Sequence, residues 1–325
     1  MTIATRTLMA LAVVVSAMPP AHVAAQSYPS HSVRMIVPYP AGGSVDVLGR
    51  AVADKLSVSM GQPVVPDNRV GANGSIAHQA VAAAPADGYT IGMSGTSPLV
   101  LAPHQIKDLP YDPTKDFAYL ACAGTTPFVI DVHPSLPVKT VQELVAYAKA
   151  NPGKLNFGSA GMGNSAHLSA ELFKRATGID MVHVPYKGNA LAMQDLIAGN
   201  IQVLFDPVQT SIPQIQSGKV RPLAVTSKTR FAELPNLPTV AESGYPGYDF
   251  VVWYAFVAPA ATPAPIVAKL NAEINKAVSD PEMKKKFAAL GADLTASKPD
   301  ECGAFVRSEL AVWGKLMADV GIRKE

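Results

Sequence analysis

Charged residues are scarce in this sequence of 325 residues. They make up 16% of the chain, against roughly a quarter in an average soluble domain, whereas apolar residues make up 48%. The 27 Lys and Arg residues nearly balance the 25 Asp and Glu residues, and no basic run is longer than Lys284-Lys285-Lys286. A protein that binds nucleic acid electrostatically needs a basic face, so the composition argues against that class. The apolar content argues against disorder.

Cysteine is almost absent as well, because Cys122 and Cys302 are the only two. Two cysteines exclude a disulfide-dense scaffold and a C-x-x-C zinc or redox motif. The histidines show no metal-ligand spacing, and the P-loop, G-x-S-x-G and H-E-x-x-H motifs are missing. We therefore expect no metal and no cofactor. Export would allow a disulfide, but the two positions lie far apart in the sequence, and we expect two buried or unpaired thiols.

Long apolar runs are missing too, apart from one short run near the N-terminus. Arg6 precedes an apolar stretch over 8–18, and Val23-Ala24-Ala25 offers the small residues that a signal peptidase recognises. That stretch is too short to span a bilayer as a helix. We therefore expect residues 1–25 to be a signal peptide cleaved before Gln26. The rest has no comparable run, so we expect a soluble, exported protein, which in a bacterium means the periplasm. We also expect a monomer.

The remaining chain alternates strands, glycine-rich turns and helices. A β-rich run over 33–38 ends in Ala41-Gly42-Gly43, and an amphipathic helix pattern follows until Gly61. A second strand over 155–157 likewise leads through a glycine-rich turn into a helix over 166–176. This alternation is typical of α/β proteins with a mostly parallel sheet flanked by helices. Further strands are predicted at 63–65, 89–93, 128–132, 181–185, 201–205, 223–226 and 250–257, with those at 181–185 and 201–205 buried.

The end of the chain is helical and has no sheet of its own. Helices are predicted over 264–279, 282–290 and 299–320. Because packing them onto the first module buries their apolar stripes, we expect a two-lobed α/β clamp. Its domain 1 is then discontinuous, with residues 26–124 plus 251–325, and domain 2 comprises residues 125–250.

Two glycine-rich turns, over 40–46 and 158–167, are candidate anion sites. Each leads from a strand into a helix, so its backbone N–H groups lie unpaired at the positive end of the helix dipole. Such a turn binds an anion without Lys or Arg. Ligands bind at the carboxyl ends of strands in open α/β sheets, so two facing turns would hold one anion from both sides.

Other interpretations of these turns fit less well. The G-x-G-x-x-A pattern over 161–166 resembles a dinucleotide fingerprint, but the next strand does not end in the acidic residue that the fingerprint requires. Ser159 and His167 could form a hydrolase pair, but no nucleophile elbow surrounds the serine. His167 is better interpreted as a donor to the ligand or to its own loop, and we expect no catalytic residue.

Several polar and aromatic side chains have two possible roles. Asp46 either caps the loop amides or contacts the ligand. Asp206 either faces the cleft or starts the next turn, and Lys187 could be solvent exposed. Tyr39 and Trp253 could wall the pocket, although aromatic side chains more often belong to the core. The predicted ligand-binding set is Tyr39, Ala41, Gly42, Gly43, Asp46, Asn73, Ser94, Thr96, Ser159, Ala160, Gly161, Asn164, His167 and Asp206.

The motifs, taken in order, resemble the Bug-type substrate-binding receptors of the tripartite tricarboxylate transporters. The similarity covers nearly all of the chain after the expected signal peptide. It lies in Val37-Pro38-Tyr39-Pro40-Ala41-Gly42-Gly43 with Asp46 and Arg50, Gly71-Ala72-Asn73-Gly74, Tyr111-Asp112-Pro113, Ala148-Lys149-Ala150-Asn151-Pro152-Gly153, Gly158-Ser159-Ala160-Gly161 with His167-Leu168, Val184-Pro185-Tyr186-Lys187-Gly188 and Leu237-Pro238-Thr239-Val240-Ala241-Glu242.

The resemblance implies a Venus flytrap whose lobes close on a carboxylated solute, with the loops at 39–43 and 159–164 as pincers. It implies delivery to a membrane permease of one large and one small subunit, or presentation to a sensor kinase. Where the family often has Asp-Asn, this chain has Asp206-Pro207, and we expect the far wall of the pocket to depart from the family's there. The solute could be a dicarboxylate, a tricarboxylate, an aromatic acid or an acidic amino acid. The small loop at 94–97 and Tyr39 favour a slim or flat one.

Overall fold

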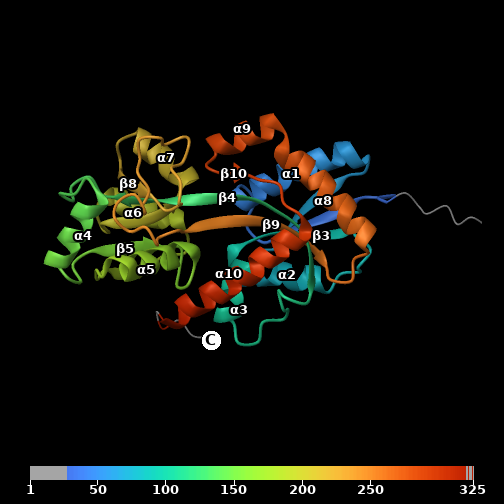
Figure 1. Ribbon diagram of the computed structural model, residues 1–325, viewed down its shortest axis with the longest axis horizontal. Helices are drawn as coiled ribbons and strands as arrows, with labels where there is room; N and C mark the ends of the chain where they lie inside the picture. Colours follow the sequence, from blue (N-terminus) through green and yellow to red (C-terminus); the bar gives the residue numbers. More distant parts are fainter. Residues whose placement is uncertain (1–27, 320, 322–323, 325) are drawn as a thin grey trace, which may run out of the picture.

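The computed structural model describes residues 28–319, 321 and 324. The expected signal peptide at residues 1–25 lies outside them. Within the described part, none of the helices combines the length and the apolar character needed to cross a membrane. The chain forms two halves, each a sheet with helices on its faces, and the strands β4 and β9 run between them (Figure 1).

The strands form one hydrogen-bonded path in the order β2-β1-β3-β9-β4-β7-β5-β6, with β8 and β10 added to β4. In the first half β1 pairs in parallel with β2 and β3, and in the second half β5 pairs in parallel with β6 and β7. Antiparallel pairs appear where β9 and β4 enter, because these two strands connect the halves in opposite directions. The strands are β1 (Val33–Val37), β2 (Val64–Asn68), β3 (Thr90–Gly95), β4 (Phe117–Val132), β5 (Asn156–Ser159), β6 (Val182–Pro185), β7 (Val203–Pro207), β8 (Arg221–Val225), β9 (Val251–Pro259) and β10 (Asp293–Leu294).

Strand β4 is much longer than the predicted strand over 128–132. It pairs with β9 from Phe117 to Pro127, and it then pairs with β7 from Phe128 onward. The register shifts near Gly124, whose φ of 147° lies in the region that favours glycine. Glycine, proline and small residues between Phe117 and Pro127 interrupt the alternation of apolar and polar residues that predicts a strand. The sequence pattern therefore predicts only the last part of β4.

Alternate residues of β1 show how the sheet of the first half is covered on both faces. Met35 and Val37 pack in one cluster with residues of α1 and α8, whereas Ile36 packs in a second cluster with residues of α2 and α10. The C-terminal helices therefore pack on the first half, as expected. The helices are α1 (Ser44–Met60), α2 (Ser75–Ala82), α3 (Ala102–Gln105), α4 (Val141–Ala150), α5 (Ser165–Thr177), α6 (Asn189–Ala198), α7 (Val208–Gln216), α8 (Ala264–Ser279), α9 (Pro281–Ala289) and α10 (Pro299–Asp319), with short helical turns η1 (Ala72–Gly74) and η2 (Ser97–Leu101).

The second half contains features that the sequence pattern missed. No helix was predicted at α6 or α7. Pro213 lies inside α7, where proline is unfavourable, and Leu191 of α6 is an exposed apolar residue that blurs the amphipathic pattern. The expected buried strand at 181–185 is the edge strand β6, with Val182 46% exposed. An edge strand has a neighbouring strand on one side only. The residues of β6 are therefore more exposed than those of the buried strand that the sequence predicts.

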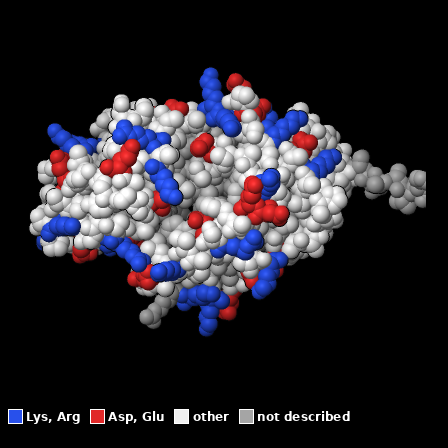
Figure 2. All heavy atoms as spheres, viewed as in Figure 1, with Lys and Arg blue, Asp and Glu red and all other residues white. Residues whose placement is uncertain are grey.

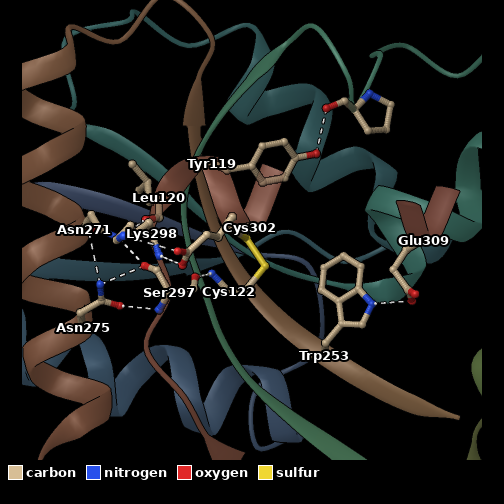
Figure 3. Close-up of a disulfide and its surroundings, with 12 residues drawn as sticks. Tyr119, Leu120, Cys122, Trp253, Asn271, Asn275, Ser297, Lys298, Cys302 and Glu309 are labelled. Atoms are coloured by element: carbon tan, nitrogen blue, oxygen red, sulfur yellow. Dashed lines mark hydrogen bonds and ion pairs between the residues drawn. A yellow bond between two sulfur atoms is a disulfide. The ribbon is translucent and has the colours of Figure 1, made fainter. Parts of the chain in front are cut away.

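The two cysteines form a disulfide, which corrects the expectation of two unpaired thiols. Cys122 lies on β4 and Cys302 near the start of α10, with their Cα atoms 5.2 Å apart (Figure 3). The fold brings these positions together because α10 packs against β4. Ser297, just before α10, accepts a hydrogen bond on its Oγ from the Cys122 N–H and one on its backbone oxygen from Asn271 Nδ2. The start of α10 is therefore attached to the sheet by the disulfide and by the Cys122–Ser297 hydrogen bond, and to α8 by the Asn271–Ser297 hydrogen bond.

Candidate functional site

A pocket of about 480 Å³ lies between the two halves, where β4 and β9 cross from one to the other. Both halves and the crossing strands contribute to its wall, so any molecule held there contacts both halves at once. The residues that line it are Tyr39, Gly43, Ser44, Val45, Asn73, Gly95, Thr96, Ser97, Thr126, Phe128, Ala160, Asn164, Ser165, Ala166, Asn189, Pro207, Gln209, Thr210, Val252, Trp253 and Tyr254.

The N-termini of α1 and α5 enter this pocket from opposite halves. Ser44 and Val45 are the first residues of α1, and Ser165 and Ala166 are the first residues of α5; all four line the pocket. Their N–H groups have no carbonyl partner within the helix, and each helix dipole has its positive end here. The α1 N-cap, Gly43, has no side chain to satisfy those groups. Two sets of backbone donors therefore face the same space.

Two further helices begin at the same pocket. Asn189 is the first residue of α6, and Gln209 and Thr210 belong to the first turn of α7. Among the described residues that line the pocket, none is acidic or basic. On the face shown in Figure 2, Lys and Arg lie scattered among Asp and Glu rather than gathered in one patch. Positive potential in the pocket thus comes from four helix N-termini and not from basic side chains.

Asp46 holds the first loop in place from behind the pocket wall. Its side chain is buried, and Oδ2 accepts a hydrogen bond from the Gly42 N–H at 2.9 Å. Arg50 Nε and Asn68 Nδ2 also donate to this carboxylate, and Asn68 Nδ2 donates to the Tyr39 backbone oxygen at 2.8 Å. Burial opposes ionisation, but the hydrogen bonds from Arg50, Asn68 and Gly42 outweigh it and lower the pKa of Asp46. Asp46 is therefore an anionic support for the loop.

The second loop is supported by a pair of stacked histidines. His167 Nδ1 accepts a hydrogen bond from the Gly163 N–H at 2.9 Å, and Asn164 Oδ1 caps α5 by accepting from the His167 N–H. The His167 ring stacks on His183 with a centroid distance of 4.0 Å. Burial lowers the pKa of each histidine to about 4, so both are neutral at pH 7. A neutral His167 has the unprotonated Nδ1 that this loop contact requires.

Most of the chain matches a known protein family. The model of the tripartite tricarboxylate transporter family receptor matches residues 48–322. The chain belongs to this family.

Individual relatives extend the match over nearly the whole chain. The receptor is 36% identical to the protein BugT of Bordetella pertussis over 304 residues, which cover 93% of each chain. Its structure resembles that of R. palustris Rpa4515 with adipate, with a TM-score of 0.83, 36% identity and coverage of 92% of this chain and 100% of that one. MatC from Rhodopseudomonas palustris with bound malate gives a TM-score of 0.77 and 29% identity, covering 89% and 99%. The α/β periplasmic binding-protein fold is thereby confirmed.

The receptor is a binding protein and not an enzyme, and the geometry at Ser159 agrees with its family. Ser159 is fully buried, and its Oγ lies 2.7 Å from His183 Nε2, so its partner is not the His167 considered in the sequence. Within the described residues, His183 Nδ1 has no hydrogen-bond partner. A catalytic serine needs access to substrate and a base oriented by a third group. The Ser159–His183 pair has neither and instead stabilises the loop.

Two other predicted residues lie behind the wall. Ser94 Oγ is hydrogen-bonded to His78 Nε2 at 2.7 Å, and both side chains are buried. Asp206 is fully buried and accepts hydrogen bonds from Asn189 Nδ2 at 3.0 Å and from Thr210 Oγ1. Burial raises the pKa of Asp206 to about 7. Because Asn189 and Thr210 both line the pocket, Asp206 acts on the pocket by orienting its neighbours.

The predicted site is therefore divided between residues that line the pocket and residues that do not. Six predicted residues line the pocket: Tyr39, Gly43, Asn73, Thr96, Ala160 and Asn164. Eight do not: Ala41, Gly42, Asp46, Ser94, Ser159, Gly161, His167 and Asp206. Trp253, for which the sequence allows either a core position or a place in the pocket wall, lines the pocket.

The main omission was the crossing strands. Thr126 and Phe128 of β4 and Val252 and Tyr254 of β9 line the pocket, and Gln209 Nε2 donates to Thr126 Oγ1 and to the Tyr254 hydroxyl. The alternation of Thr126 with Phe128 gave a usable signal, because residues two apart share one face of a strand. The predicted strand over 128–132 excludes Thr126, so the pattern does not assign this residue to the face that lines the pocket.

Proposed function

We propose that this receptor captures a small organic carboxylate in the pocket between its halves. The proposal rests on one observation: the N-termini of α1, α5, α6 and α7 converge on a pocket with no charged side chain in its described lining. Hydrogen bonds to a charged group contribute roughly 1.5–3 kcal/mol each, so four or five of them, less the cost of closure, suffice for micromolar affinity. The adipate and malate bound by Rpa4515 and MatC are both carboxylates, which supports this class of ligand.

The wall between the helix ends favours a slim or flat ligand. Phe128, Val252 and Trp253 give the pocket apolar surface, whereas the helix N-termini supply donors. A linear dicarboxylate or an aromatic acid matches this distribution, since its apolar middle is buried while its carboxylate accepts hydrogen bonds.

We further propose that the halves are lobes that close on the ligand by a hinge in β4 and β9. The proposed lobes are residues 26–124 plus 251–325 and residues 125–250. In support, β4 changes its partner from β9 to β7 between Pro127 and Phe128, and β9 begins at Val251. The chain passes between the proposed lobes only at these two strands, so they are the segments that need to change conformation when such lobes rotate.

The family implies where the ligand goes. We propose that the receptor acts in the periplasm, after removal of residues 1–25, and delivers the carboxylate to a membrane permease of one large and one small subunit. The family description, a receptor of tripartite tricarboxylate transporters, supports this role.

The test is a thermal-shift panel on the chain from Gln26, refolded from denaturant to remove any ligand carried from the cell. The panel contains adipate, malate, benzoate and nicotinate, each beside its uncharged amide, and glutamate beside its diamide, which lacks both carboxylates. At 100 times Kd a ligand adds about 2.7 kcal/mol to stability, which is a rise of several degrees. We expect that rise for one class of acids and not for the amides. Equal shifts for acids and amides, or no shift with any acid, would contradict the proposal.

A further inference from the structure

A bridge of side-chain hydrogen bonds crosses from one half to the other beside the pocket. Asn73 Nδ2 donates to Gln105 Oε1 at 3.2 Å, and Gln105 Nε2 donates to the backbone oxygen of Gly163. Asn73 and Gln105 belong to the first half, in η1 and at the end of α3, whereas Gly163 lies in the loop between β5 and α5 of the second half. Asn73 and Asn164 line the pocket, but Gln105 does not. Gln105 therefore joins the two walls without forming part of the site.

The first end of this bridge is anchored in its own half. His104 Nε2 donates to the Leu310 backbone oxygen of α10 at 2.9 Å. Gly314 of α10 passes so close that a Cβ there would lie 2.5 Å from the His104 ring. The residue preceding Gln105 is thus fixed against α10, whose start is attached to β4 by the disulfide.

Gly163, at the other end of the bridge, is fixed within the second half. The Gly163 N–H donates to His167 Nδ1, and Gly163 adopts a φ of 69°, which favours glycine. A Cβ at Gly163 would also lie 2.2 Å from Gln105 Nε2, so only glycine admits this approach. Because each end is fixed to its own half, the Gln105–Gly163 hydrogen bond forms when the halves are together and breaks when they separate.

We propose that Gln105 is a closure latch, a positioning residue that stabilises the closed receptor and touches no ligand. The latch proposal depends on the proposed function in one respect, which is that ligand binding accompanies closure. A bond made in the closed form alone adds the same free energy to every complex, whatever the ligand. The latch therefore sets a common residence time, whereas residues of the pocket wall distinguish one ligand from another.

The test compares the variants Q105A and Q105E with Q79A. Q105E keeps the side chain's size and an acceptor for Asn73, but it removes the donor to Gly163. Gln79 is an exposed glutamine of α2 with no side-chain hydrogen bond among the described residues, so Q79A is the matched control. Dissociation and association rates are measured by stopped flow with adipate and with malate. Small-angle scattering of the ligand-free proteins measures their radius of gyration.

We expect Q105A and Q105E to accelerate dissociation of both acids by the same factor, about three- to tenfold, with association unchanged. Their ligand-free radius of gyration should exceed that of the wild type and of Q79A. Dissociation rates equal to those of Q79A would overturn the latch, and so would factors that differ between the two acids. If the wild type bound neither these acids nor any other acid of the panel, the proposed function would fail instead. In that case the scattering measurement alone would test the latch. A radius of gyration in ligand-free Q105E equal to that of the wild type would overturn it.

Discussion

Individual carboxyl groups in this receptor behave differently according to their partners. Asp46 is buried among donors and stays ionised, whereas Asp131 of β4 is buried with one hydrogen bond, accepted from Ser211 Oγ at 2.6 Å. In the described structure Asp131 Oδ1 has no partner. Burial raises the pKa of Asp131 to about 8, and the nearby carboxyl of Asp206 contributes to the same shift. The folded receptor therefore keeps a proton on Asp131 at neutral pH.

This proton makes stability depend on pH in a definite direction. Between the unfolded and folded pKa values, the folded state holds a proton that the unfolded state has lost, so the free energy of unfolding falls as the pH rises. Between pH 6.5 and 8 the loss from Asp131 is about 1–2 kcal/mol. Asp131→Asn imitates the protonated acid and should flatten this decline, as measured by calorimetry at several pH values. Asp293→Asn, at an exposed position of β10, is the control. An undiminished slope in Asp131→Asn would contradict the assignment.

For individual residues of the site, the sequence predicts some features and not others. Both glycine-rich loops follow a strand and precede a helix, as the order of residues predicts, and their role in binding stays a prediction. The sequence could not tell lining residues from supporting ones. Asp46 and His167 are polar residues at the start of helices, as Asn164 is, and only the fold decides that Asn164 faces the pocket while the other two hold loops.

At the scale of elements, the start of α5 has two separable functions. Asn164 caps the helix through its Oδ1, which accepts from the His167 N–H at 2.9 Å, and it also lines the pocket. Aspartate caps helices as well as asparagine does, and its charge interacts favourably with the dipole. The same charge would repel a bound carboxylate. Stability and binding can therefore be changed independently at this position.

Two substitutions of Asn164 test this separation. Asn164→Asp should keep or raise the melting temperature and weaken carboxylate binding by at least about 100-fold, the factor that like charges in contact produce. Asn164→Ala should lose about 1 kcal/mol of stability with a much smaller loss of affinity. Calorimetry gives the stability and isothermal titration gives the affinity. If Asn164→Asp bound carboxylates as tightly as the wild type, the α5 N-terminus would not be part of the anion site.

The elements themselves were predictable to different degrees. Helices α1 and α5 were predicted nearly to the residue, because Gly61 and Gly178 end them in the left-handed conformation. Strand β4 was predicted only over its last part, since its long-range partners β9 and β7 determine its length. The C-terminal helices pack on the sheet of the first half. This packing is predictable because their apolar stripes must be buried against another element.

For the whole molecule, the disulfide connects two segments that are 180 residues apart in sequence. It closes a loop containing all of the second half and joins the start of α10 to the sheet of the first half. Neither cysteine lines the pocket. We therefore expect the disulfide to contribute to the stability of the receptor and not to its affinity for ligand.

The double variant Cys122→Ser/Cys302→Ser tests this assignment. A disulfide that closes a long loop restricts the unfolded chain, and its removal typically costs about 2–5 kcal/mol. We expect a lower urea midpoint with unchanged ligand affinity at temperatures where the variant is folded. Reductant should lower the midpoint of the wild type to a similar value and leave the variant unaffected. An unchanged midpoint in the variant would show that the cross-link contributes little.

The proposed anion site, which consists of main-chain groups, has an evolutionary consequence. The N–H donors at the starts of α1 and α5 are present whatever side chains the pocket carries, so most point mutations of the wall leave them intact. Natural selection can then exchange wall residues such as Phe128 or Trp253, and thereby change the preferred solute, without first losing the capacity to hold a carboxylate. Such a scaffold can diversify quickly among acids that share one functional group, and its descendants need to conserve the glycine-rich turns more strictly than any wall residue.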